Sequence, residues 1–108
     1  MKAFIRLFTR EGFEVESTSN ISDAYERIKK VPYDCVIMSI NSSDYLGEHD
    51  FLVYTKKVSP KATAVVISEF PQIDKTMNLI GYGADGVFVK PVKINLLIDA
   101  VKGNINPN

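Results

Sequence analysis

The sequence contains three kinds of side chain that could carry out chemistry: one thiol, one imidazole and a run of hydroxyls. Cys35 lies in an apolar run without a nearby cation or helix N-terminus, so we interpret it as a small buried thiol in a reducing compartment. His49 is the only histidine and has no second histidine or cysteine near it, which argues against a metal site. The polar stretch Ser17–Asn20 could hold a phosphate, but we favour a loop that caps the next helix.

Two hydrophobic periods alternate along the chain and predict the elements that position these side chains. Phe4, Leu7 and Phe8 recur at helical spacing, whereas 35–38 and 62–67 are continuous apolar runs of strand length. Strands that are apolar on both faces are typical of parallel sheets covered by helices. The predicted helices are 1–11, 21–28, 51–58, 73–80 and 94–101, and the predicted strands are 13–16, 35–38, 62–67 and 86–89.

Length and composition restrict the class of protein. The chain has 108 residues, with 45% apolar and 24% charged residues, and we expect a single small globular domain over 1–108. Lys and Arg number 13 and Asp and Glu number 13, so no basic excess predicts nucleic-acid binding. No apolar run approaches membrane-spanning length, and charged residues near Met1 argue against a signal peptide. These features favour a cytoplasmic protein.

Stretches in a fixed order then form a family pattern. Pro32–Ile40 and Gly83–Pro91 have the form of two strands with their flanking turns, Glu11–Val15 that of a helix-to-strand turn, and Ile67-Ser68 that of a strand ending in a hydroxyl. Together they resemble the response-regulator receiver domains, the family of the chemotaxis response regulators. The resemblance implies an α/β, flavodoxin-like, doubly wound parallel sheet whose active site lies at the carboxyl ends of the strands. The family's first strand and its acidic pair are absent from the sequence, so we interpret the domain as N-terminally truncated.

The resemblance also implies roles for individual residues. Receivers accept a phosphoryl group from a histidine kinase on an aspartate that ends the third strand, and that position here is Ser39. The hydroxyl and lysine that stabilise the phosphoryl group are retained as Ser68 and Lys90, and Pro91 suggests the cis peptide common in the family. Without the acidic pair we predict no catalytic residue, no metal site and no cofactor, with magnesium only if the site were active.

Each retained position also has a simpler interpretation. A serine hydroxyl is not ionised at neutral pH and needs an adjacent base to act as a nucleophile, so we interpret Ser39 as a small polar replacement. We interpret Lys90 as structural or vestigial, reaching solvent or another acid such as Asp44. Asp44 is the nearby replacement carboxylate, and we interpret it as a solvated turn residue.

The absent first strand would lie in the middle of the sheet, between 13–17 and 34–40. Its absence would leave buried backbone groups unpaired, at about 1–3 kcal/mol each. The two flanking strands could close up, a partner chain could supply the strand or exchange elements in a dimer, or the sequence could be a truncated product. Because closure would disturb the packing of the flanking helices, we predict a homodimer or higher oligomer.

Two hypotheses for function follow. The first is a receiver-like (pseudo-receiver) signalling domain in a bacterial-type two-component system, which binds proteins, is not an enzyme and works without aspartyl phosphorylation. The alternative is a phosphoacceptor of a two-component phosphorelay with an incomplete N-terminus and chemistry on Ser39 or Asp44. A flavin-binding electron carrier is a more distant third.

Overall fold

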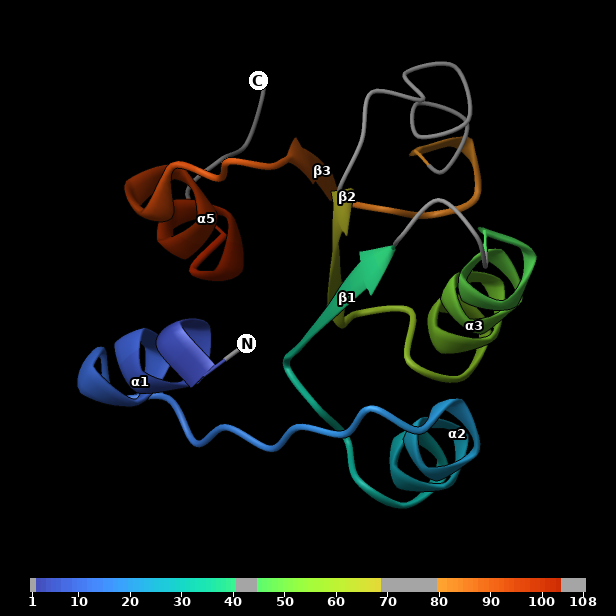
Figure 1. Cartoon of the computed structure of the whole chain (residues 1–108). Helices are drawn as coiled ribbons and strands as arrows, with labels where there is room; N and C mark the ends of the chain where they lie inside the picture. The colour runs from blue at the N-terminus through green and yellow to red at the C-terminus, as the bar shows by residue number, and fades with distance from the viewer. Residues whose placement is uncertain (1, 41–44, 69–79, 104–108) are drawn as a thin grey trace.

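The structure is a computed structural model that describes residues 2–40, 45–68 and 80–103 (Figure 1). It confirms the alternation of helices and strands in most of the predicted places. The elements, in chain order, are α1 (Lys2–Arg10), α2 (Ile21–Lys30), β1 (Cys35–Ile40), α3 (Tyr45–Val58), β2 (Thr63–Ser68), β3 (Gly86–Val89) and α5 (Ile94–Val101).

The strands form a parallel sheet in the order β1-β2-β3. Within the described residues β2 is the central strand, and its Ala64, Val65, Val66 and Ile67 have no exposed surface. Helices α1 and α5 cover one face of the sheet, and α2 and α3 cover the other (Figure 1). The doubly covered parallel sheet predicted from the continuous apolar runs is therefore confirmed.

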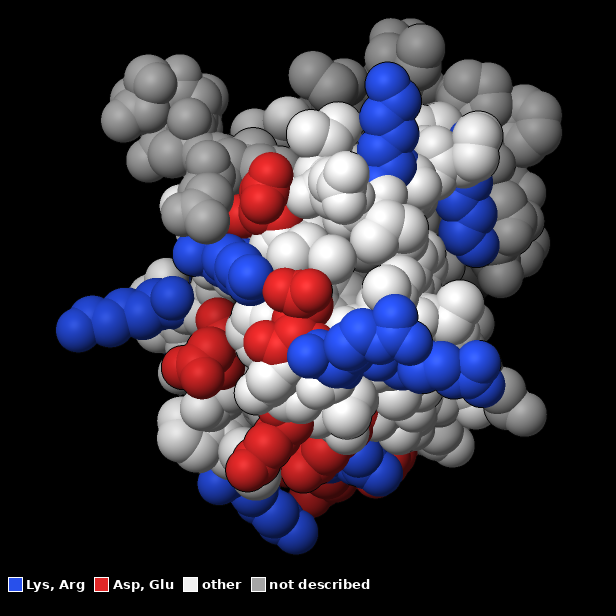
Figure 2. Space-filling model, turned by 90° about the vertical axis from the view of Figure 1, so that its left-hand side faces the viewer, with Lys and Arg blue, Asp and Glu red and all other residues white. Residues whose placement is uncertain are grey.

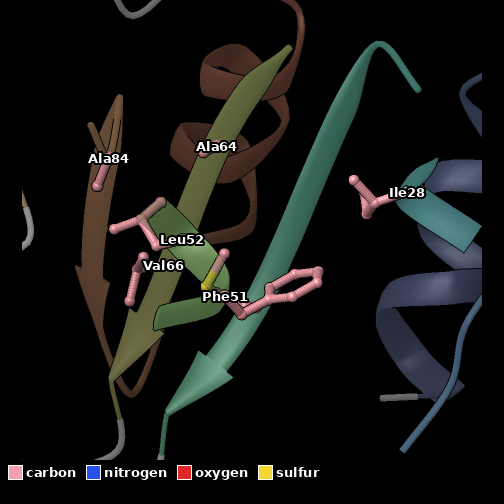
Figure 3. Close-up of a cluster of buried hydrophobic side chains, with 7 residues drawn as sticks. Ile28, Phe51, Leu52, Ala64, Val66 and Ala84 are labelled. Atoms are coloured by element: carbon pink, nitrogen blue, oxygen red, sulfur yellow. The ribbon is translucent and has the colours of Figure 1, made fainter. Parts of the chain in front are cut away.

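A separate apolar cluster holds each helical layer to the sheet. On one face Phe8 of α1 and Leu97 of α5 pack with Val65 and Ile67. On the other face, residues of α2 and α3 pack against β1 and β2, and Figure 3 shows the Phe51 and Ile28 side chains pointing toward one another. Because β2 contributes to both clusters, it connects the two layers.

The surface over α1 and α5 carries charges of both signs. Figure 2 shows basic and acidic side chains interspersed on this face, and Lys102 forms a salt bridge of 2.9 Å with Glu11. A protein surface that binds nucleic acid needs clustered basic residues, and this face does not present such a stripe. In the described residues, no helix has the length and apolar character needed to cross a membrane.

The strand predicted at 13–16, or 13–17 beside the absent first strand, is wrong. Residues 13–18 carry no strand pairing and run as an extended connection between α1 and α2 (Figure 1). The alternation of Phe13, Glu14, Val15 and Glu16 does orient the segment, because Phe13 and Val15 pack with the cluster under α1. A strand also requires a hydrogen-bonded neighbour, and the described residues place none beside this segment.

Two predicted helices differ from the structure in their bounds or in how much of them it describes. The helix predicted at 51–58 begins earlier, at Tyr45, so His49 lies inside α3. Residues 45–50 lack the regular apolar spacing from which the helix at 51–58 was predicted. The helix predicted at 73–80 falls outside the described residues except for its last residue, which is helical.

A polar contact fixes the amino-terminal side of the sheet. The Asp85 Oδ2 accepts hydrogen bonds from the Ala64 backbone N–H at 2.7 Å and from the Lys56 Nζ at 3.1 Å. Lys56 also donates to the Ala62 carbonyl at 2.7 Å. The Asp85 side chain thus links α3, β2 and the turn before β3.

We expect Asp85→Ala to lower the free energy of unfolding by about 1–3 kcal/mol, because the N–H of fully buried Ala64 loses its acceptor. Asp85→Asn is the matched control, since its amide oxygen can still accept that bond. Urea denaturation of both variants measures the difference. Equal losses in the two variants would show that this hydrogen bond is not the cause.

Candidate functional site

The residues that the resemblance selected lie at the carboxyl edge of the sheet. Ser39 is the penultimate residue of β1, Ser68 ends β2, and Lys90 directly follows β3. The side chains of Ser39 and Lys90 are exposed, and Ser68 is buried. Since the strands are parallel, their ends form one shared rim.

The strand register defines how close these positions are. Ser39 pairs with Ile67, whereas Ser68 pairs with Ile40 on one side and with Val89 on the other. The Lys90 backbone N–H donates to the Ser68 carbonyl at 2.9 Å, and the Lys90–Pro91 peptide bond is cis, as the resemblance implied. The sheet therefore brings Ser39, Ser68 and Lys90 to the same rim within two residues of register.

This rim offers a hydroxyl and an ammonium group but no described carboxylate on its strands. The acids nearest the strands, Asp34 and Asp85, immediately precede β1 and β3 and so lie at the opposite, amino-terminal edge. Asp44 lies outside the described residues. Among the described residues no three His, Cys, Asp or Glu side chains gather as a metal site would require.

The structure also describes the surroundings of the Cys35 thiol and the His49 imidazole. Burial, and then the nearby charges of Asp85 and Asp34, raise the pKa of the Cys35 thiol to about 12. A thiol with so high a pKa is almost entirely protonated at neutral pH, which fits the predicted unreactive cysteine. His49 packs edge-on against Tyr82, with ring centroids 4.2 Å apart.

The hydroxyl-rich stretch acts as the predicted helix cap. The Asn20 Oδ1 accepts a hydrogen bond from the Asp23 backbone N–H at 3.0 Å, at the first turn of α2. The Thr18 Oγ1 accepts from the Asn20 N–H at 3.1 Å. These local bonds use the Asn20 and Asp23 backbone N–H groups within the turn itself.

A groove lies along the edge of β1 that has no strand neighbour among the described residues, and the sequence alone did not predict its shape. It has a volume of about 350 Å³ and lies between Cys35–Ser39 of β1, α2 and the connection 16–20. Two of its lining residues are hydrogen-bonded to each other: Tyr33 donates to Glu16 at 2.6 Å, and this hydrogen bond raises the pKa of the Tyr33 phenol. The signal in the sequence was the expected gap between 13–17 and 34–40. We call this feature the β1-edge groove.

Comparison with known proteins gives a consistent result. The family model of the response regulator receiver domain matches residues 1–102. A curated relative, the TorCAD operon transcriptional regulatory protein TorR of Escherichia coli O157:H7, is 28% identical over 97 residues, 88% of this chain and 40% of the relative. The chain thus spans less than half the length of that relative.

Solved structures share the fold. A receiver domain protein from Clostridium thermocellum superposes with a TM-score of 0.84 at 22% identity, covering 97% of this chain and 84% of that one. A response regulator from Burkholderia pseudomallei, solved with a phosphorylated aspartic acid, calcium ion and citrate, gives 0.83 at 16% identity, covering 95% and 60%. The expected flavodoxin-like receiver fold is therefore confirmed.

Proposed function

The chain belongs to the response regulator receiver domain family of two-component signalling, and from this premise we propose that it is a pseudo-receiver. It contacts other signalling proteins through its folded surface and works without aspartyl phosphorylation. It has no catalytic activity of its own and needs no cofactor. We assign residues 1–108 to one receiver-like domain that acts in the cytoplasm.

Ser39 carries the proposal. It occupies the position that corresponds to the acceptor aspartate, at the carboxyl end of β1. A carboxylate attacks a phosphoryl donor in its ionised form, whereas a serine hydroxyl must first lose its proton to a base. Among the described residues of the three strands, no acid stands at this rim to act as that base.

The retained positions fit a vestigial rim. The Ser68 carbonyl accepts a hydrogen bond from the Lys90 backbone, so these residues help hold β2 and β3 together whether or not phosphate binds. Receiver domains interact with kinases and other proteins, and such contacts do not require the phosphoryl group itself. Self-association, the other contact predicted from the sequence, stays a prediction that light scattering tests.

We expect the mass of the intact protein to stay unchanged after incubation with acetyl phosphate and magnesium. A receiver domain with a complete acidic site, treated in parallel, gains one phosphoryl group and shows that the donor is active. Gain of one phosphoryl group by this chain, removed by Ser39→Ala, would instead support the phosphoacceptor alternative.

A further inference from the structure

We draw no further inference here: the strongest candidate, the surface patch of exposed apolar side chains at Val89 of β3 and Leu96 of α5, carries none because nothing in the described residues shows what covers it.

Discussion

The Ser39→Asp variant of the 108-residue chain is expected to stay unphosphorylated in acetyl phosphate and magnesium. Ser39 is exposed at the end of β1, so an aspartate there can ionise in water and will not disturb the core. The carboxylate alone is insufficient, because the charge of the transferring phosphoryl group must be neutralised by a metal ion as well as by Lys90. The described residues contain no cluster of acids that could hold that ion.

Intact mass after the incubation checks this expectation, with Ser39→Asn as the matched control of similar size. A calorimetric titration of both variants with magnesium should show no saturable binding at sub-millimolar concentration. A phosphoryl adduct on the Asp variant that is absent from the Asn variant would contradict the prediction. It would mean that a single substitution is enough to restore the chemistry.

Leu52→Ala is expected to lower the free energy of unfolding by about 2–5 kcal/mol. Leu52 of α3 has no exposed surface and packs in the cluster that joins α2 and α3 to β1 and β2 (Figure 3). Truncation removes buried apolar contacts and leaves a cavity. Since a domain of this kind has about 5–15 kcal/mol of stability in total, the variant should unfold at a clearly lower urea concentration.

Val53→Ala, on the next residue of the same helix, is the matched control. The Val53 side chain is 40% exposed, so its truncation should change stability by about 0.5 kcal/mol or less. Urea denaturation followed by circular dichroism compares the two variants. Similar losses for Leu52 and Val53 would mean that the described packing of α3 is wrong.

The amino-terminal and carboxyl-terminal rims of the sheet carry different groups of polar residues. At the amino-terminal rim, Asp85 and Lys56 make polar contacts that stabilise the fold. At the carboxyl rim lie Ser39 and Lys90, and the sequence resemblance predicts that they stand at the family's phosphoryl-transfer positions. Under the proposed function, Ser39 replaces the acceptor carboxylate at an exposed position of this rim.

The sequence by itself determined the layers of the protein. Continuous apolar runs predicted β1 and β2, and helical spacing predicted α1, α2 and α5, because burial on one or two faces leaves a periodic trace in the chain. The family pattern also located Ser39, Ser68 and Lys90 at strand ends. These properties are local, because they depend only on residues that are close together in the sequence.

Only the tertiary structure decided what depends on partners far apart in the chain. The alternating residues 13–16 looked like a strand, yet a strand exists only when another strand accepts its hydrogen bonds, and the described chain places none there. The groove beside β1 and the Asp85 contact to Ala64 also depend on residues that are far apart in the sequence. Periodicity records which face of a segment is buried, whereas pairing depends on which segment arrives beside it in space.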